Sequence, residues 1–285
     1  MCRDGPADKR QGVHGRAAPG ILRRMGLKIC THALVRPPGA SFAAGISAGA
    51  FGRADLDLAR EQHGAYTRAL AAAGVEVITL PPLDDFPDSC FVEDCAIVIG
   101  DGFVATRPGA EARRGEVASI EAALTAHLAK LGAIVGAGTV DGGDVLRAGE
   151  QYFIGASERS NADGAAQLID AIEFAGARGK RLDFSGALHL KSLCSPIGDN
   201  VVLAVPALIE PFRQHWIDVV EVGDLDAYGA NALRVNDTLM IAAGFGAVRR
   251  AIVAAGVVTD DRIVELDMSE FRKQDGALTC LCLLW

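Results

Sequence analysis

Four short segments of the sequence place reactive or charged side chains among apolar residues, at 87–94, 139–146, 188–192 and 278–283. The last of them holds Cys280 and Cys282, the third holds a histidine, His189, and the first two hold carboxylates. A cysteine, a histidine and a carboxylate on separate strand ends are the parts of an activated thiolate site, in which a nearby cation lowers the thiol pKa. The set therefore predicts nucleophilic catalysis by Cys280.

Two adjacent acids, Glu93 and Asp94, open an apolar run that has the composition of a strand. An unpaired carboxylate is costly at such a position, and neighbouring strand residues point to opposite faces. Surplus acids suit a cationic substrate and would make little sense beside an anionic one. Taken by itself, the segment also fits a solvated turn in front of a strand.

The glycine pair Gly142 and Gly143 lies between Asp141 and Asp144. Adjacent glycines fit a tight turn whose backbone must approach another group closely, although an ordinary turn has the same composition. His189 stands between two leucines. Its surroundings in the sequence therefore also fit a histidine that is simply buried in the core.

A Cys-Leu-Cys triplet ends the last apolar run of the chain. Cys280 and Cys282 would share one face if this run is a strand. The simpler interpretation is a pair of buried thiols that act as small hydrophobic side chains. The triplet offers two ligands and no nearby partner set, so we expect no metal site here.

Periodicity and turn residues predict alternating helices and strands. Helices are expected at 55–73, 111–131, 161–174, 211–216 and 245–255, with Asn161 as an N-cap. Strands are expected at 75–80, 91–99, 103–106, 133–135, 145–147, 152–155, 181–184, 189–194, 201–205, 219–222, 233–242, 263–267 and 278–284. The pattern of hairpin, helix and strand recurs about every 45–55 residues, which favours a radial or stacked α/β array. The hairpins and the lack of a GxGxxG motif weigh against a plain Rossmann sheet.

Composition narrows the class. Of the 285 residues, 50% are hydrophobic and 22% are charged, so the chain can bury a core. The formal net charge of -8 argues against nucleic acid as a partner. The most apolar long stretch, 240–258, contains Arg249 and Arg250, so we expect no membrane segment. Residues 1–25 are interpreted as a disordered tail or an over-long start, which leaves 26–285 as one domain.

The chain has seven cysteines and no CxxC pair. An odd number of cysteines in a chain of this size argues against a disulfide framework or a structural zinc site. The composition instead predicts reduced thiols in a cytosolic protein.

The motifs PDSCFVED, TRPGAEARR, VDGGDV, LHLKS and DGALTC, in this order and spacing, resemble those of the dimethylarginine dimethylaminohydrolase family. That family belongs with arginine deiminase to the guanidine-modifying, or pentein, superfamily. The resemblance covers about residues 26–285 and implies a five-bladed α/β propeller with pseudo-fivefold symmetry. It also implies hydrolysis of asymmetric dimethylarginine or monomethylarginine to citrulline through a covalent Cys thiouronium, without a metal or organic cofactor.

The resemblance implies roles for ten residues. Cys280 matches the nucleophile, His189 the general acid and base, and Asp141 the carboxylate that orients the histidine. The matched substrate-binding positions are Glu93 and Asp94 at the guanidinium, Asp88 near the α-amine, Arg113 and Arg159 at the α-carboxylate, Ile46 in a mobile lid, and Gln274 through a backbone contact. Arg114 is adjacent to Arg113 and easily confused with it.

Some alternatives stay open at this point. Another guanidine-modifying enzyme, such as an arginine deiminase, would use the same chemistry, although typical arginine deiminases are longer. An alternative hypothesis outside the enzymes is a non-catalytic propeller that acts as a binding module. Cys282 and Cys95 are expected near the pocket, where Cys282 would be either a benign replacement or a second pocket thiol that is sensitive to oxidation or soft metal ions. An acidic, apolar-rich surface permits a homodimer without requiring one.

Overall fold

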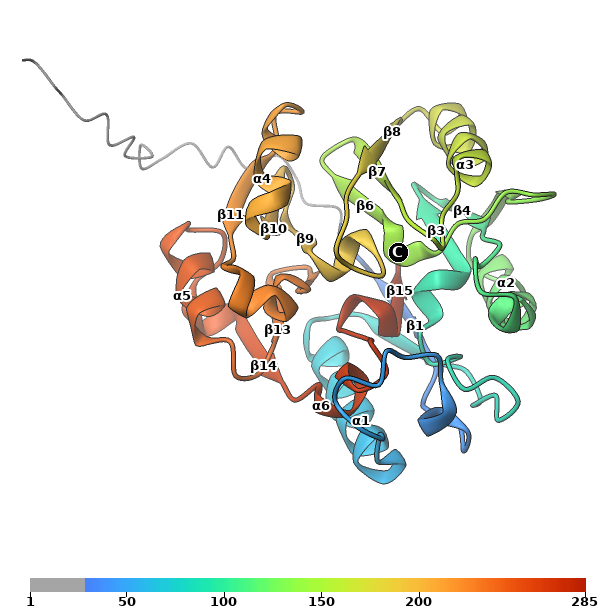
Figure 1. Ribbon diagram of the computed structural model, residues 1–285, viewed down its shortest axis with the longest axis horizontal. Coiled ribbons are helices and arrows are strands. Elements are labelled where there is room, and N and C mark those ends of the chain that lie inside the picture. Colours follow the sequence, from blue (N-terminus) through green and yellow to red (C-terminus); the bar gives the residue numbers. More distant parts are fainter. Residues whose placement is uncertain (1–28) are drawn as a thin grey trace, which may run out of the picture.

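Five three-stranded sheets surround a common centre in the computed structural model, which describes residues 29–285 (Figure 1). The predictions made for residues 1–25 lie outside the described residues. The first strand of each sheet is its inner strand: β15 (Cys282–Leu284), β3 (Ala96–Ile99), β6 (Val145–Ala148), β9 (Cys194–Gly198) and β12 (Leu233–Val235). The second is antiparallel to the first: β1 (His32–Val35), β4 (Gly102–Ala105), β7 (Gln151–Ala156), β10 (Val201–Ala204) and β13 (Thr238–Ala242).

The third strand of each sheet is parallel to the second. These outer strands are β2 (Glu76–Thr79), β5 (Ala129–Ala133), β8 (Arg178–Asp183), β11 (Asp218–Glu221) and β14 (Ile263–Leu266). Parallel neighbours need a crossover connection, and a helix supplies it in every sheet. The crossover helices are α1 (Leu56–Ala72), α2 (Val117–Thr125), α3 (Ala162–Phe174), α4 (Pro206–Arg213) and α5 (Gly246–Ala254).

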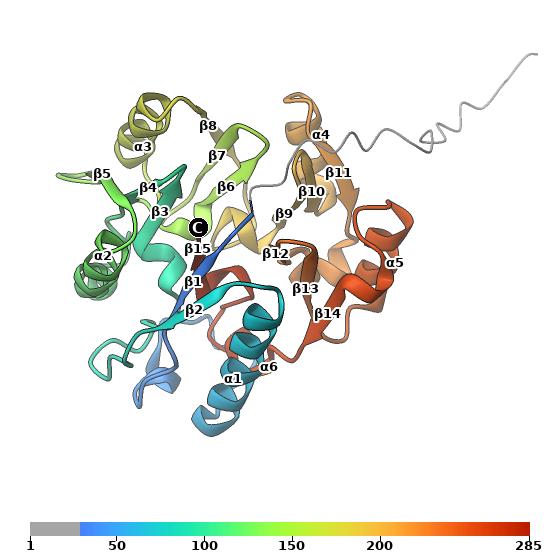
Figure 2. The ribbon, with the colours of Figure 1, turned by 180° about the vertical axis from the view of Figure 1, so that it is seen from behind.

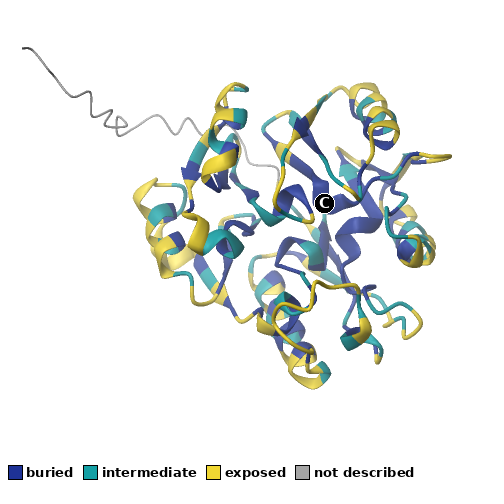
Figure 3. Ribbon diagram, viewed as in Figure 1, coloured by how far each residue is buried: buried dark blue, intermediate teal, exposed yellow. Residues whose placement is uncertain are grey.

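The two ends of the described chain meet in one sheet, which closes the ring (Figure 2). β15 pairs with β1 in antiparallel register, with Leu34 opposite Leu283. The predicted five-bladed α/β propeller is therefore confirmed. Burial follows this plan, because the strands and the centre are buried and the crossover helices expose their outer faces (Figure 3). No helix within residues 29–285 has both the length and the apolar character needed to cross a bilayer.

A short 3₁₀ helix precedes the inner strand of every sheet. These turns are η2 (Val92–Cys95), η4 (Gly142–Asp144), η5 (Leu190–Ser192), η6 (Asp224–Ala230) and η8 (Thr279–Leu281). The strands predicted at 91–99 and 278–284 were therefore wrong in their first halves, and the strand predicted at 189–194 overlaps β9 only at Cys194. Apolar residues that are buried on all sides at the centre carry no periodicity, so the pattern could not separate a turn from a strand.

Two predicted helices differ from the structure. The helix expected at 111–131 ends at Thr125, after a 3₁₀ start at η3 (Glu111–Glu116), and the next segment is β5. Leu124, Leu128 and Leu131 keep a helical spacing across that boundary, which misled the assignment. The helix expected at 211–216 is α4, which begins earlier because Pro206 occupies its first turn. A further helix, α6 (Ser269–Arg272), was not predicted.

Candidate active site

The four chemically active segments lie on four of the five central turns. Two adjoining cavities, together called the front cavity, have volumes of about 500 and 30 Å³. Their shared wall consists of Ile46, Arg159, Leu188, His189, Asp275 and Cys280. The sequence-predicted nucleophile and proton carrier therefore face the same space, although they are far apart in the chain.

His189 and Asp141 form a buried pair. The imidazole Nε2 lies 3.0 Å from the Asp141 Oδ2, and the other Asp141 oxygen accepts the Gly109 N–H at 2.8 Å. Burial alone would lower the pKa of His189, but the charge of Asp94, the hydrogen bond to Asp141 and the charge of Asp144 raise it to about 9. His189 is thus an imidazolium at neutral pH, and its Nδ1 is left to exchange a proton.

The paired glycines permit the close approach that the sequence predicts. A Cβ on Gly143 would lie 2.6 Å from the His189 Nδ1, and one on Gly142 would overlap the Glu93 carbonyl oxygen. The Gly143 N–H also donates to Asp94 Oδ1 at 2.8 Å. Any larger side chain here would displace the histidine or the turn that carries the acids.

Asp94 is held as a carboxylate below the front cavity. Its Oδ2 accepts the Arg113 Nη1–H at 2.5 Å. Burial would raise the pKa of Asp94, but His189, Arg113 and the Gly143 N–H together lower it to about 2. Asp94, Asp141 and His189 are the one group within residues 29–285 whose potential metal ligands lie within 4.8 Å of one another. Those atoms already serve the Arg113 and His189 bonds, so the arrangement is that of a proton-transfer site.

Arg113 is more fully engaged than the sequence suggests. This buried guanidinium bonds to Asp94, to both oxygens of Glu116, and to the Asp88 and Phe91 carbonyls. Its charge is therefore already matched by protein carboxylates.

Arg159 differs from Arg113 in its bonding. Its side chain makes no hydrogen bond or ion pair within residues 29–285, although it lines both parts of the front cavity. Arg114 bonds to Glu111 and lies outside the front cavity. A role for both Arg113 and Arg159 at an α-carboxylate stays a prediction.

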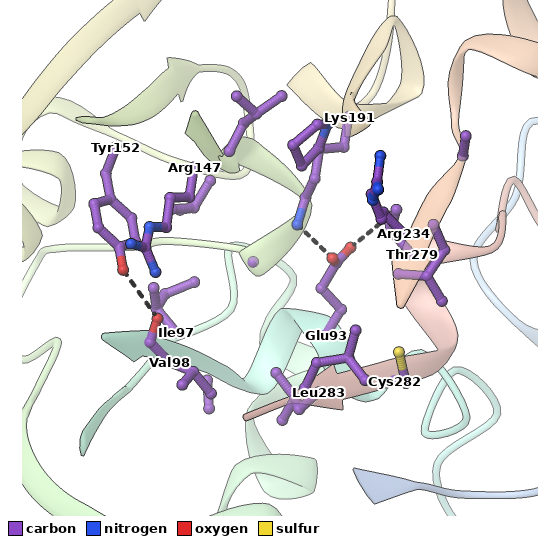
Figure 4. Close-up of a pocket in the computed structure, with 18 residues that line it drawn as sticks. Glu93, Ile97, Val98, Arg147, Tyr152, Lys191, Arg234, Thr279, Cys282 and Leu283 are labelled. Carbon is purple, nitrogen blue, oxygen red and sulfur yellow. Dashed lines mark hydrogen bonds and ion pairs between the residues drawn. The ribbon is translucent and has the colours of Figure 1, made fainter. Parts of the chain in front are cut away.

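Glu93 and Asp94 point in different directions, as expected for adjacent acids. The Glu93 carboxylate is bonded to Lys191 on one oxygen and accepts the Thr279 hydroxyl at 3.0 Å on the other (Figure 4). Burial raises the pKa of Glu93, and the Lys191 ammonium opposes that effect. The contact of Glu93 with a guanidinium therefore stays a prediction.

Sequence reasoning missed Lys191, Thr279 and Asn231. Asn231 bonds to the Lys191 carbonyl and to the Thr279 side chain, and its Oδ1 accepts the Thr279 N–H. The network fixes the turn that carries Cys280. A buried lysine and a buried glutamate must find an opposite charge, and that rule was the available signal for the Lys191–Glu93 pair.

Cys280 lies in η8 and is partly exposed to the front cavity. Burial, and then the charges of Glu93 and Asp94, raise its pKa to about 12. The ligand-free site therefore holds a neutral thiol, in contrast to the lowered pKa expected from the sequence. Removal of the sulfur from water, and then its carboxylate neighbours, are the physical reason.

The predicted second pocket thiol was wrong. Cys282 begins β15, is buried, and lies in the wall of a separate cavity behind Glu93. Cys95 is buried with its sulfur 3.9 Å from a Glu116 oxygen, and it does not line the front cavity. Cys280 lies in a 3₁₀ turn and Cys282 begins the strand that follows, so the two side chains line different cavities.

The smaller part of the front cavity also carries polar groups away from the four central turns. Asp88 accepts the Ile46 N–H at 3.1 and 3.2 Å, which ties the 46–51 loop over the cavity. The Ala48 N–H likewise donates to Asp275 at 2.6 Å. Gln274 has a buried side-chain oxygen without a partner within residues 29–285. The sequence had predicted only a backbone contact for Gln274.

A cysteine, a protonated histidine and buried acids at the centre of a five-bladed α/β propeller define a guanidine-modifying type of site. Comparisons with known proteins narrow this class. The family model described as arginine deiminase matches residues 82–259. The dimethylarginine dimethylaminohydrolase of Pseudomonas aeruginosa is 36% identical over 253 residues, which cover 88% of this chain and 98% of that protein.

Two further matches agree. The enzyme of the same name from Streptomyces coelicolor is 37% identical, covering 87% of this chain and 95% of that protein. The solved structure of a cysteine-to-serine mutant of the Pseudomonas aeruginosa enzyme, complexed with citrulline, has a TM-score of 0.85 and 34% identity over 90% of this chain and 100% of that one. This chain belongs to the dimethylarginine dimethylaminohydrolase family.

The raised pKa of His189 is tested by removing its carboxylate. We expect Asp141→Asn to lower that pKa from about 9 toward the ordinary 6.5, because the hydrogen bond and the charge that favour the imidazolium are lost. Histidine ring signals followed by NMR across pH would show the change, with His189→Gln to assign the signal. An unchanged titration of His189 in Asp141→Asn would contradict the pairing.

Proposed function

We propose that this protein hydrolyses Nω,Nω-dimethylarginine, and also the monomethyl form, to citrulline and the corresponding methylamine. The observation that carries the proposal is the front cavity, where Cys280, His189 and Asp94 meet beside an amino-acid-sized recess. The family relationship supports the same substrate class.

The substrate completes the nucleophile. In the free site, burial and then the two acids raise the pKa of Cys280, so the thiol keeps its proton. A guanidinium bound over Asp94 brings a positive charge next to the sulfur and opposes the effect of Glu93 and Asp94, so the thiol releases its proton to solvent when substrate binds. The thiolate is favoured only when substrate is present, and it takes a proton back when citrulline forms and leaves.

Attack and proton transfer follow from the positions of Cys280 and His189 in the wall of the same cavity. The thiolate forms a bond to the central guanidinium carbon, and His189, an imidazolium at neutral pH, donates its Nδ1 proton to the departing dimethylamine as the C–N bond breaks. The product is a covalent thiouronium. Neutral His189 then takes a proton from water, whose oxygen bonds to the same carbon while the C–S bond breaks, and citrulline leaves. Asp141 keeps the ring in place in both steps.

Recognition of the amino-acid end involves separate groups. Arg159, which has no side-chain partner within residues 29–285, supplies a guanidinium for the α-carboxylate. Asp88 and the unpartnered Gln274 oxygen accept from the α-ammonium, and Ile46 covers it from the loop. Arg113 acts chiefly by holding Asp94 in place. A direct hydrogen bond from Arg113 to the α-carboxylate of the substrate would be a second role. This division favours a free amino acid over a residue inside a protein chain.

We further propose that the protein works in a reducing compartment such as the cytosol. Five of the described cysteines, Cys90, Cys95, Cys194, Cys280 and Cys282, are free thiols within residues 29–285, which is compatible with that setting. The homodimer stays a prediction from composition.

The reaction is tested by citrulline formation from asymmetric dimethylarginine, with arginine assayed in parallel. We expect turnover of the methylated substrate and complete loss in Cys280→Ser, because a serine hydroxyl is a much weaker nucleophile than a thiolate. Cys282→Ser is the matched control and should retain activity, since this thiol does not line the front cavity. Turnover of arginine alone would move the protein to the deiminase reading. No turnover of either would contradict the proposal.

The carboxylate contact is tested by Arg159→Ala against Arg114→Ala. Losing a charge-assisted bond costs roughly 1.5–3 kcal/mol, so we expect kcat/KM to fall about ten- to a hundredfold in Arg159→Ala, mostly through KM. Arg114→Ala should match the wild type, because Arg114 lies outside the cavity. Equal effects in the two variants, measured by steady-state kinetics, would remove Arg159 from the binding site.

A further inference from the structure

A second cavity lies behind the Glu93–Lys191 pair and is called the rear cavity here (Figure 4). Its volume is about 210 Å³, and the inner strands β3, β6, β9, β12 and β15 all contribute to its wall. Cys280 and His189 are absent from this wall, whereas Lys191 borders both the front and the rear cavity. The rear cavity is thus a separate space that shares one buried cation with the active site.

The wall of the rear cavity is cationic in a chain whose formal net charge is -8. It contains the side chains of Arg147, Arg234 and Lys191, and Glu93 is its one acid. Figure 4 shows Arg147 and Arg234 on opposite sides of the Glu93–Lys191 pair. Because Lys191 already neutralises Glu93, the two arginines leave a local excess of positive charge between apolar strands.

Lys191 and Arg147 each have N–H groups that make no hydrogen bond within residues 29–285. The buried Lys191 ammonium has one hydrogen-bond partner within residues 29–285, the Glu93 carboxylate, although it carries three N–H groups. Arg147 donates its Nε–H to the Gly149 carbonyl and packs over the Tyr152 ring at 5.7 Å, which leaves most of its N–H groups for a ligand.

Arg234 is held more firmly than Arg147. Its Nε–H and Nη1–H donate to backbone carbonyls, among them that of Ile197 at 2.7 Å. The Nη2 group has no partner in the described part of the chain. A fixed guanidinium with a free edge is a preorganised donor for an oxyanion.

We propose that the rear cavity binds a small oxyanion with two negative charges, either a phosphate or a short dicarboxylate. Guanidinium groups match the geometry of carboxylate and phosphate oxygens, and apolar walls strengthen the attraction by excluding water. The volume of about 210 Å³ lies below the roughly 300–1,000 Å³ of sites for drug-sized ligands, so a nucleotide is too large.

An occupant of the rear cavity acts on Cys280 through Lys191. Lys191 bonds to Glu93, and Glu93 accepts the hydroxyl of Thr279, the neighbour of Cys280. An anion bound beside Lys191 in the rear cavity interacts with the ammonium charge that otherwise compensates Glu93 alone. It also adds a negative potential near the Cys280 sulfur. Both effects oppose thiolate formation. The anion is therefore an inhibitor that does not compete with substrate, a consequence that rests on the proposed function.

Binding is measured by isothermal titration of phosphate, and separately of succinate, into the full chain at low salt. We expect one saturable site in the wild type and about tenfold weaker binding in Arg147→Gln and in Arg234→Gln. Arg262→Gln removes the same charge from an exposed position and should bind as the wild type does. The tighter of the two probes identifies the anion class.

Two outcomes would overturn the site. One is the absence of saturable binding to the wild type with both probes. The other is that Arg159→Gln loses binding while Arg147→Gln keeps it, which would place the anion in the front cavity. Arg234→Gln removes hydrogen bonds to backbone carbonyls, so its folding is checked by thermal unfolding. The exposed Arg147 makes only one backbone hydrogen bond, so Arg147→Gln tests anion binding even if Arg234→Gln does not fold.

Activity assays separate the site from its effect. We expect the bound probe to lower kcat without raising KM, and Arg147→Gln to relieve this while matching the wild type when no anion is added. Saturable binding without inhibition would confirm the site and overturn the coupling through Lys191. A wild type that binds the anion but turns over no guanidine substrate would contradict the proposed function but not the anion site in the rear cavity.

Discussion

Buried carboxylates at the centre of the propeller are the constraint on which the rest of the site depends. Asp94, Glu93 and Asp141 are removed from water, and each faces one cation: Arg113, Lys191 and His189 respectively. A buried charge without a partner is very costly, so these pairs fix the turns that carry them. The Glu93–Lys191 and Asp141–His189 pairs join separate blades, whereas the Asp94–Arg113 pair links η2 to η3, which begins the crossover within the β3–β4–β5 sheet.

Burial, together with the charge balance at this centre, explains why the resting thiol keeps its proton. A Cys280 thiolate would add a fourth negative group to three acids that are already matched. The guanidinium of a substrate adds one positive charge, so substrate and thiolate together leave the balance unchanged. The reactive form of the cysteine is thus tied to the presence of the molecule on which it acts. The same logic makes Lys191, which borders both cavities, the residue through which the rear cavity can influence catalysis.

The sequence anticipated the ring, because the repeated hairpin, helix and strand favoured a radial or stacked α/β array and the family resemblance implied five blades. It also pointed to Cys280 and His189, whose catalytic roles stay predictions, and Asn161 caps α3 with its side chain as expected. The glycine pair beside Asp141 correctly predicted a close backbone approach. These signals are local, because they depend on residues within one turn or one period.

What the sequence could not provide depends on contacts between blades. Lys191 and Glu93 are 98 positions apart, and the sequence around either residue does not indicate that the two form a pair. The 3₁₀ turns that begin the inner strands look like strands in the sequence, which placed Cys282 beside Cys280 when the two thiols serve different cavities. The thiol pKa was expected to be low because a histidine was near, whereas burial, and then the charges of the acids packed around Cys280, raise it once the fold is assembled.

The charge-completion account is tested most directly by the thiolate absorbance of Cys280, taken as the difference between the wild type and Cys280→Ser across pH. The account predicts a pKa near 12 without ligand, a clear fall when the N,N-dimethylguanidinium ion is added, and no fall with uncharged N,N-dimethylurea of similar shape. A thiolate already present at neutral pH in the free protein, or an equal effect of the urea, would contradict it.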